Sequence, residues 1–558
     1  MIGELSPGLV LIAGAALIPL FRANWRNAYL LILPLLSCAY VLTLPYGEFG
    51  QMSIFDYDLT TVRVDKLSFV FAVVFHLAAF LAALYALHES DCVQHSAGFI
   101  YAGSAIGAVF AGDLITLFIF WELTAISSVF LIWARRNEKA YHAGMRYLIV
   151  QVTSGLLLLA GVVLRGRETG DIGFDFLGLN DLGTSLIFVA FGIKCAFPLL
   201  HNWLQDAYPE ATVAGTVFLS AFTTKLAVYA LARGFAGTEM LVWIGAAMTA
   251  FPIFYAVIEN DLRRVLAYSL NNQLGFMVVG IGVGTEMALN GTAAHAFTHI
   301  IYKALLFMSM GAVLYRTGTI KGSQLGGLYK SMPYTTIFCI IGAASISAFP
   351  LFSGFISKSL IIAAIADPSY VLVWWVLIFA SAGVFHHSGI KIPFFAFFAH
   401  DSGIRCKEAP MNMLLAMGGA ALLCVALGVY PTPLYGLLPF PMEYEPYTPT
   451  HVITQLQLLL FSALAFAVLK RTGVYPPELR AINLDSDWFY RRLPKLGWSW
   501  AIAPVFRGVE GCVQSARARI APIVIVAPEI RGPSLLSLLV VLLLFCFLVM
   551  SLWQYFQL

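Results

Sequence analysis

The stretch that decides the fold is 334–366, YTTIFCIIGAASISAFPLFSGFISKSLIIAAIA. It is apolar almost throughout, and a bilayer core about 30 Å thick needs only about 20 such residues per helix. The run is therefore too long for one straight crossing. Pro350, near its centre, removes a backbone donor and breaks or kinks a helix at membrane depth. The pattern predicts a membrane-spanning helix that is broken in two.

The four residues around this proline occur a second time. Ala-Phe-Pro-Leu stands at 348–351 and also at 196–199, each time near the middle of a long apolar run. Paired interrupted helices in two halves of a chain are typical of transporters built from repeats. The two broken helices are five predicted spans apart, an odd number, so they would run in opposite directions. The echo predicts two inverted repeats, each with a broken helix, at Pro198 and Pro350.

Apolar runs of similar length recur along the whole chain of 558 residues. They predict an all-α polytopic membrane protein with about 14–16 transmembrane helices. The predicted spans fall roughly at 7–21, 28–44, 67–87, 95–111, 113–133, 145–165, 184–204, 213–234, 241–259, 263–283, 290–315, 334–366, 371–394, 412–431, 453–470 and 534–555. The sequence lacks the alternating pattern of a membrane β-barrel, so helices are the fold that satisfies the backbone.

Charge supports this order of spans. With the N-terminus outside, basic residues such as Arg22, Arg135 and Arg263 fall in loops on the inside, whereas the opposite loops are acidic or mixed. This alternation follows the positive-inside rule. The first span lacks a basic n-region and is expected to be retained. We expect a multi-pass protein of the bacterial cytoplasmic membrane.

The predicted spans divide the chain into regions. We predict N-terminal transmembrane helices over 1–94, a first repeat over 95–240, a second repeat over 241–400, C-terminal transmembrane helices over 401–470, a basic cytoplasmic or interfacial linker over 471–533 and a final transmembrane helix over 534–558. A snorkelling surface segment is the favoured interpretation of the linker. We assign no functional role to the residues after 430.

Composition excludes several classes of function. The chain is 60% hydrophobic and 11% charged, with a mean hydropathy of +0.82, whereas a soluble protein carries about 25% charged residues. A soluble enzyme, a disordered regulator and a nucleic-acid binder are excluded, and a net charge of +3 is too small for a polyanion-binding face. The eight cysteines are scattered without a CxxC pair, and no phosphate-binding glycine motif is present. No cofactor, metal site or catalytic chemistry is expected in the chain itself.

Charged residues nevertheless stand deep within predicted spans. They are Glu122, Lys194, Lys225, Lys303 and Lys358. Each costs about 3 kcal/mol or more at a bilayer centre. Several helical turns separate each from either interface, so snorkelling does not explain them. A structural role is the alternative, but the set favours a path for protons or ions.

Two histidines extend this set. His295, His299 and Lys303 are spaced i, i+4, i+8 and share one helix face. Because histidine exchanges protons near neutrality, a water-bridged row of such groups favours a proton relay. A satisfied core histidine is the alternative for each ring alone. A metal site is disfavoured because the HExxH pattern and nearby cysteine or carboxylate ligands are missing.

A group of short motifs between about 65 and 390 occurs together in one known family. The motifs are Phe-Trp-Glu-Leu at 120–123, Gly-Ile-Lys at 192–194, His-Asn-Trp-Leu-Gln-Asp-Ala at 201–207, Phe-Thr-Thr-Lys at 222–225, Asp-Leu-Arg-Arg-Val-Leu-Ala-Tyr-Ser at 261–269, His-Ala-Phe-Thr-His-Ile-Ile-Tyr-Lys-Ala-Leu-Leu-Phe at 295–307 and Ser-Gly-Phe-Ile-Ser-Lys at 353–358. Through them the chain resembles the antiporter-like subunits shared by Mrp-type multisubunit cation/proton antiporters and respiratory complex I, most closely the D-type subunits of the Mrp antiporters.

The resemblance implies a role for each lysine. Glu122 matches the family's carboxylate that pairs with the lysine of the first broken helix, here Lys194. Lys225 and Lys303 match the connecting lysines, and Lys358 matches the terminal lysine near an exit half-channel. Family members carry protons along this axis, coupled through a neighbouring subunit.

The chain also departs from the family pattern. Gln205 and Tyr208 stand where proline and histidine are common, which affects the loop after the first break. Near the end of 371–394, His386, His387 and Lys391 either join the exit path or, in the case of Lys391, snorkel to the surface.

These observations predict a proton-translocating membrane subunit of a multisubunit monovalent cation (Na⁺)/proton antiporter. Its expected partners are other membrane subunits, protons, Na⁺ or K⁺ and the lipid bilayer, and no nucleic acid. The alternative is a proton-pumping subunit of a complex I-like NADH:quinone oxidoreductase or a membrane hydrogenase complex. A structural membrane subunit without transport is an alternative of another class, disfavoured because the full charged row is present.

Overall fold

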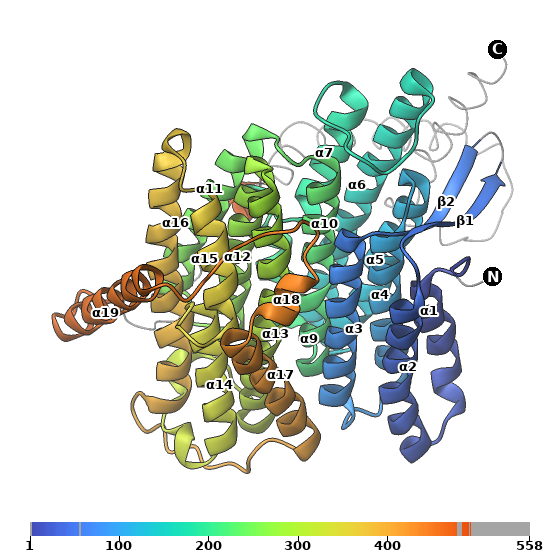
Figure 1. Cartoon of the computed structure of the whole chain (residues 1–558). Coiled ribbons are helices and arrows are strands. Elements are labelled where there is room, and N and C mark those ends of the chain that lie inside the picture. The colour runs from blue at the N-terminus through green and yellow to red at the C-terminus, as the bar shows by residue number, and fades with distance from the viewer. Residues whose placement is uncertain (1–2, 55–56, 477–482, 490, 493–558) are drawn as a thin grey trace, which may run out of the picture. The chain divides into compact units, whose positions relative to one another are not determined.

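The computed structural model describes residues 3–54, 57–476, 483–489 and 491–492. The chain divides into two compact units, Met1–Asp485 and Ser486–Leu558. The helices and strands named below belong to the first unit (Figure 1). The expected final helix over 534–558 and most of the expected linker over 471–533 lie outside the described residues.

The first repeat and the helices before it contain the following elements. They are α1 (Pro7–Leu17), α2 (Ala23–Thr43), β1 (Gly47–Ile54), β2 (Tyr57–Val64), α3 (Lys66–Ala86), α4 (Cys92–Phe110), α5 (Leu114–Trp133), α6 (Glu138–Thr169), α7 (Leu182–Lys194), α8 (Asn202–Ala207), α9 (Val213–Ala221) and α10 (Thr223–Gly234).

The second repeat and the helices after it follow the same all-α plan. They are α11 (Glu239–Ile258), α12 (Leu262–Val283), α13 (Glu286–Thr317), α14 (Pro333–Ile346), α15 (Ser353–Ala364), α16 (Val371–Val384), the π-helical stretches η6 (Phe385–Lys391) and η7 (Phe394–Phe398), α17 (Met411–Val429), α18 (Thr432–Gly436) and α19 (Pro449–Arg471).

Every predicted span up to 453–470 coincides with one helix or with a pair of shorter helices. Within the described residues, ten helices are long and apolar enough to cross a membrane. The others are shorter or more polar, such as α4 and α12, or belong to the broken pairs. The predicted all-α membrane fold is confirmed, and the chain is a multi-span membrane protein.

The two broken helices share one backbone conformation. The break between α7 and α8 places Ala196 and Leu199 at φ +61° and +70°, and the break between α14 and α15 places Ala348 and Leu351 at +57° and +73°. Residues with a Cβ avoid this left-handed region, at a cost of about 1–2 kcal/mol each. The Ala-Phe-Pro-Leu echo is therefore a repeated structure as well as a repeated sequence.

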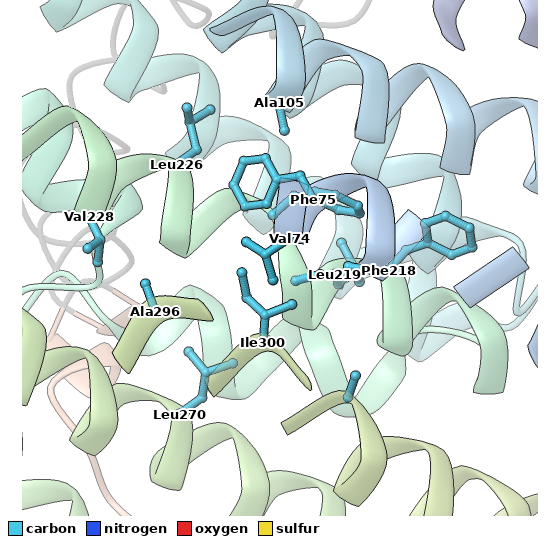
Figure 2. Packing of buried hydrophobic residues seen from close by; sticks show 14 of the residues in the cluster. Val74, Phe75, Ala105, Phe218, Leu219, Leu226, Val228, Leu270, Ala296 and Ile300 are labelled. Atoms are coloured by element: carbon cyan, nitrogen blue, oxygen red, sulfur yellow. The ribbon is translucent and has the colours of Figure 1, made fainter. Parts of the chain in front are cut away.

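The helices at the centre of the bundle carry two of the buried lysines, Lys225 on α10 and Lys303 on α13. In the most apolar windows of α13 and of α9–α10, 94% of the residues are buried, compared with 11% in α19. Figure 2 shows apolar side chains of α3, α9, α10 and α13 packed together there, with Val74, Phe75, Leu219 and Ile300 among them. These helices form the interior, whereas α19 lies at the rim.

Close contact of α11 and α12 depends on two glycines. A Cβ atom at Gly245 would lie 2.7 Å from the carbonyl oxygen of Gly275, and a Cβ at Gly275 would lie 2.6 Å from that of Gly245. Small residues at such crossings permit the tight van der Waals packing that holds membrane helices together.

A β-hairpin between α2 and α3 is a local feature that the sequence reasoning missed. Strands β1 and β2 pair antiparallel from Gly47 opposite Val64 to Ile54 opposite Tyr57. The hairpin is fastened to the start of α5, since the Thr60 amide donates to the Asp113 carboxylate at 3.0 Å. It lies on the side expected to face outward.

Candidate functional site: a buried row of ionisable side chains

The ionisable residues predicted in the membrane lie in the interior of the first unit. Lysines come from both repeats, and each of them is at most 1% exposed: Lys194, Lys225, Lys303, Lys358 and Lys391. His295, His299 and His387 are fully buried too. The remaining two members, Glu122 and His386, are partly buried.

At one end of the row, Glu122 of α5 faces Lys194, the last residue of α7. The Lys194 ammonium donates to the Trp121 carbonyl at 2.5 Å and to the Thr124 hydroxyl at 2.9 Å, both on α5. It also lies 4.4 Å from the centre of the Trp121 ring. The charges of Glu122 and Lys194 interact, although no hydrogen bond joins the two among the described residues.

The Glu122 carboxylate is packed against a glycine. A Cβ atom at Gly155 of α6 would lie 1.5 Å from Oε1 of Glu122. That same oxygen is buried and has no hydrogen-bond partner in the described chain. An unpaired buried carboxylate oxygen is costly. Protonation of Glu122, or a change in its distance from Lys194, would therefore alter the energy of this end of the row.

Lys225 sits beside an interruption that the sequence did not reveal. The α-helix stops at Ala221 and begins again at Thr223, with Phe222 at φ −101° and ψ −66°. The Lys225 ammonium donates to the Ser220 carbonyl at 2.6 Å. In the described chain the lysine is thus held by a main-chain oxygen at the helix interruption and has no carboxylate partner.

The predicted face of α13 forms the centre of the row. The rings of His295 and His299 lie 6.1 Å apart, and the Tyr302 hydroxyl lies 3.4 Å from Nε2 of His295. Both ring nitrogens of His299 and the Lys303 ammonium are buried without a hydrogen-bond partner among the residues that the structure describes. Such groups in proteins are normally satisfied by ordered water.

The second broken helix meets α13 at this point. Ser357 of α15 lies 3.0 Å from Nδ1 of His295 and 2.9 Å from the Thr298 hydroxyl. The next residue, Lys358, donates to the Ile346 carbonyl at 3.0 Å, which is freed at the end of α14. The break therefore supplies a main-chain acceptor for the lysine.

The last three candidates lie on η6. Lys391 donates to the carbonyls of Ala256, Val257 and Glu259 at 3.2, 2.6 and 2.7 Å, at the end of α11. Its side chain is buried against these main-chain oxygens. His387 lies 2.9 Å from the Ser388 hydroxyl, which donates to Ser269 of α12.

His386 points elsewhere. Its ring packs against Phe466 of α19 and Tyr475, with ring centres 5.2 and 5.3 Å apart. This places His386 toward the rim formed by α19, away from the serine contacts of His387.

Electrostatic interactions connect the neighbouring members of the row. Lys225 interacts with Cys195, next to Lys194, and with His299 on α13. Lys303 interacts with Lys225 and Lys358. His387 continues the row, interacting with Lys303 and Lys391. A change of charge at one member is therefore felt by its neighbours across both repeats.

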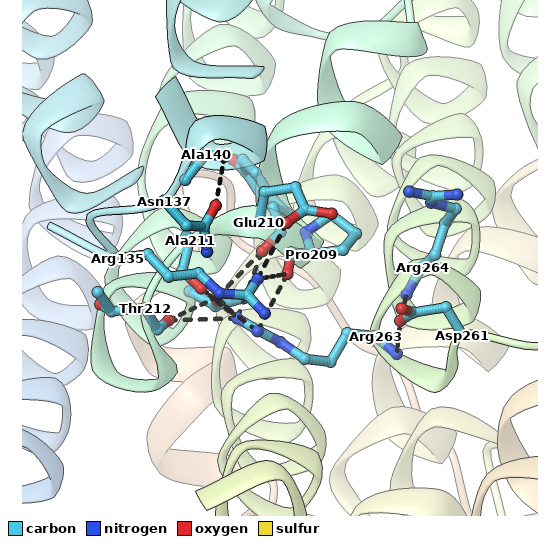
Figure 3. Close-up of polar contacts among 12 residues, drawn as sticks. Arg135, Asn137, Ala140, Pro209, Glu210, Ala211, Thr212, Asp261, Arg263 and Arg264 are labelled. Carbon is cyan, nitrogen blue, oxygen red and sulfur yellow. Dashed lines mark hydrogen bonds and ion pairs between the residues drawn. The ribbon is translucent and has the colours of Figure 1, made fainter. Parts of the chain in front are cut away.

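Sequence reasoning gave no role to a buried arginine that binds one repeat to the other. Arg263, at the start of α12, donates to the carbonyls of Pro209 at 3.1 Å and Ala211 at 3.2 Å (Figure 3). It also donates to the Thr216 hydroxyl. Arg135 reaches the same Pro209 carbonyl at 2.9 Å. The Asp-Leu-Arg-Arg motif marked the position, but its contacts lie about 50 residues away in sequence.

The described residues contain no group of three or more His, Cys, Asp or Glu side chains placed to hold a metal ion. The fold and the row instead define a class: a polytopic helical membrane protein with two broken helices and a line of ionisable groups through its centre.

Comparison with known proteins shows which family the chain is similar to. Residues 111–386, just under half of the chain, match the family described as NADH:quinone oxidoreductase/Mrp antiporter, transmembrane. The matched region contains every residue from Glu122 to His386 of the row and leaves out His387 and Lys391.

Individual relatives come from both branches of the family. The chain is 31% identical to the D subunit of the Na⁺/H⁺ antiporter of Alkalihalophilus pseudofirmus, over 49% of this chain and 59% of the relative. It is 28% identical to hydrogenase-4 component B of Escherichia coli, over 54% of this chain and 51% of the relative. The chain thus spans about half the length of these curated relatives.

A solved structure has the same fold. The chain superposes on a chain of the Mrp complex from Dietzia sp. DQ12-45-1b with a TM-score of 0.76 and 23% identity, covering 94% of this chain and 64% of the other.

Proposed function

We propose that this chain is the proton-translocating subunit of a multisubunit monovalent cation/proton antiporter. In this proposal Glu122, Lys194, Lys225, Lys303 and Lys358 relay protons, with His295 and His299 beside them. The single observation that carries the proposal is the row of buried ionisable side chains contributed by both repeats.

The energetics support transport over a purely structural role. A charge at membrane depth costs about 3 kcal/mol or more, and close packing alone does not offset that cost at five positions. Lys194, Lys225 and Lys358 contact carbonyls and hydroxyls, and Lys303 has no hydrogen-bond partner in the described chain. Of these four, Lys225, Lys303 and Lys358 can therefore release a proton without leaving a buried carboxylate unpaired.

The arrangement also suggests how the row is loaded. A proton arriving at Glu122 would remove the negative charge that acts on Lys194. Lys194 would then lose a stabilising interaction and pass its proton toward Lys225, and the repulsion among Lys225, Lys303 and Lys358 would move it onward. His387 and Lys391 extend the row toward the end of α11 as an exit path.

Substitution of Glu122 by glutamine tests the proposal. Glu122→Gln keeps the shape of the side chain but can neither carry the charge nor exchange the proton. We expect it to abolish cation-driven dissipation of a pH gradient in membrane vesicles, with normal amounts of the protein in the membrane. An unchanged rate would remove Glu122 from the mechanism.

The partners and the cation belong to the same proposal. We propose that other membrane subunits assemble with this chain in a bacterial cytoplasmic membrane, and that Na⁺ is exchanged, with K⁺ as the alternative. The name of the Alkalihalophilus pseudofirmus relative, a Na⁺/H⁺ antiporter component, supports this assignment. The purified chain alone would show little coupled exchange, and robust exchange by the isolated chain would contradict the need for partners.

A second candidate is a proton-pumping subunit of a redox-driven complex. The family description and the likeness to hydrogenase-4 component B favour it. Affinity purification of the chain from its native membrane distinguishes the two: flavin and iron–sulfur subunits would co-purify with a redox complex, and small membrane subunits with an antiporter.

A further inference from the structure

A contact outside the row joins the end of the described chain to both repeats. The Asp485 carboxylate accepts a hydrogen bond from the Tyr268 hydroxyl of α12 at 2.9 Å and lies 3.2 Å from Nε2 of His201, between α7 and α8. The side chains of His201 and Asp485 are only 3% and 7% exposed. A titratable pair is therefore buried where the second half of the first broken helix begins.

The segment 483–485 makes further side-chain contacts with the first unit. The Asn483 amide donates to the Glu259 carboxylate at 3.1 Å, and Arg264 lies 3.9 Å from the same carboxylate. These residues lie on the side of the bundle that the basic loops place toward the cytoplasm.

Aromatic rings close the site around the pair. The His201 ring packs on Phe251 with ring centres 4.6 Å apart. Tyr268 stacks on Tyr255 at 5.2 Å, with the ring planes 11° apart. Among the described residues, the charged groups that act on Tyr268 are Asp485, Glu259 and Arg264.

Buried polar side chains without partners in the described chain occur on the elements between this pair and Glu122. Nδ1 of His201 is buried without a hydrogen-bond partner in the described chain, and so are the side-chain amides of Gln205 on α8 and Gln151 on α6. Helices α6 and α8 pack against each other. Gln151 lies one turn before Gly155, the residue in contact with the Glu122 carboxylate.

We propose that Asp485 is a proton-exchanging carboxylate that feeds the row from the cytoplasmic side through His201. Protonated Asp485 would transfer its proton from Oδ2 to Nε2 of His201, and the imidazolium would release the proton on Nδ1 to water leading toward Gln205. The carboxylate regains a proton from the aqueous side, and ring rotation restores the imidazole. The net result is one proton moved inward with no change of oxidation state.

This inference rests on the proposed function, because it adds an entry to the same relay. A role of Asp485 in proton exchange and a role in docking alone predict different effects of substitutions at position 485. Asn at 485 still accepts the hydrogen bond from Tyr268 but exchanges no proton, whereas Glu retains the exchange. A docking residue would therefore tolerate Asn, and a proton-exchanging residue would tolerate Glu.

The experiment compares Asp485→Asn, Asp485→Glu and His201→Gln in the full chain, expressed in the native host in place of the wild-type gene. The rate of cation-driven pH-gradient dissipation is measured in membrane vesicles and divided by the amount of the protein in the membrane. We expect a loss of about 100-fold for Asp485→Asn and for His201→Gln, with most of the rate retained by Asp485→Glu. Asp487→Asn is the matched control, because Asp487 pairs with Arg491 at 2.7 Å within its own segment.

Glu122→Gln, measured in the same vesicles, separates this inference from the proposed function. A rate for Asp485→Asn within about twofold of wild type overturns the inference, and if Glu122→Gln is then inactive the relay itself stands. If Asp485→Asn fails to accumulate, His201→Gln decides: a near-normal rate also overturns the inference, and a loss supports it.

Discussion

Gly155, which has no side chain, determines where the Glu122 carboxylate can lie. Its place on α6 leaves space that the Glu122 carboxylate fills, and a Cβ there would lie 1.5 Å from Oε1. Real Cβ atoms do not approach so closely, so any other residue at 155 must displace the carboxylate. The distance between Glu122 and Lys194 therefore depends on a residue with no chemistry of its own.

We expect Gly155→Ala to reduce proton transport by about 100-fold, because a misplacement of about 1 Å at a reacting group has an effect of that size. The double variant Gly155→Ala/Glu122→Asp should recover part of the rate, since the shorter carboxylate leaves room for the methyl group. Transport is measured as pH-gradient dissipation in membrane vesicles.

Gly166→Ala on the same helix is the control for this pair. A Cβ at Gly166 would lie 3.3 Å from its nearest neighbour, the Cγ2 methyl group of Ile172, so the Ile172 side chain need move by only a few tenths of an ångström. An unchanged rate for Gly155→Ala, or a double variant slower than both single ones, would show that the glycine does not position Glu122.

The residues of the row could be found from sequence, whereas the residues that hold them could not. A lysine such as Lys303 stands out because its neighbours are apolar, and it is indeed fully buried. Gly155 and Asp485 carry no such signal, because the residues that they contact are distant in sequence. Gly155 lies 33 positions from Glu122, and Asp485 lies 284 positions from His201.

At the scale of elements, α12 is tied to the loop after the first broken helix by one guanidinium. Arg263 is 1% exposed and its hydrogen bonds go to main-chain carbonyls of 208–212 and to Thr216. Arg135 shares the Pro209 carbonyl with it. Helix α12 of the second repeat is thus joined by hydrogen bonds to the loop that follows the first break.

We expect Arg263→Met to destabilise the protein by about 3 kcal/mol, because it leaves several buried carbonyls without a donor. Arg263→Lys should lie between Met and wild type, since one ammonium cannot replace a planar fork of donors. The measurement is thermal unfolding of the detergent-solubilised chain.

Arg167→Gln at the exposed end of α6 serves as the control for the loss of a positive charge. If Arg263→Met unfolded at the same temperature as Arg167→Gln, the carbonyls would be satisfied in another way and the tie between the repeats would be unimportant.

Breaks in helices were predictable only where proline caused them. Pro198 and Pro350 lie in the two breaks that share the Ala-Phe-Pro-Leu sequence. The interruption at Phe222 escaped because Phe-Thr-Thr-Lys contains no helix breaker, and tertiary packing overrides local preference there. The hairpin of β1 and β2 escaped because it is a short connection between long apolar runs.

At the scale of the whole molecule, the row crosses from the first repeat to the second. Glu122, Lys194 and Lys225 belong to helices of the first repeat, and Lys303 and Lys358 to helices of the second. The link between the halves is the pair formed by Lys225 and the α13 face, which interact electrostatically. If protons pass along one row, its members act in series.

If the lysines pass the same proton one after another, the effects of two substitutions in the row should not add. Lys225→Met and Lys303→Met each keep the side-chain volume and remove the proton-exchanging group, so each should stop pH-gradient dissipation almost completely. The double variant should be no slower than the slower single one, because a path that is already interrupted loses nothing by a second interruption. Independent half-channels would instead leave each single variant with part of the rate, and the two losses would multiply in the double variant. Vesicles that carry equal amounts of each protein decide between these outcomes, and multiplying losses would show that the two repeats conduct separately.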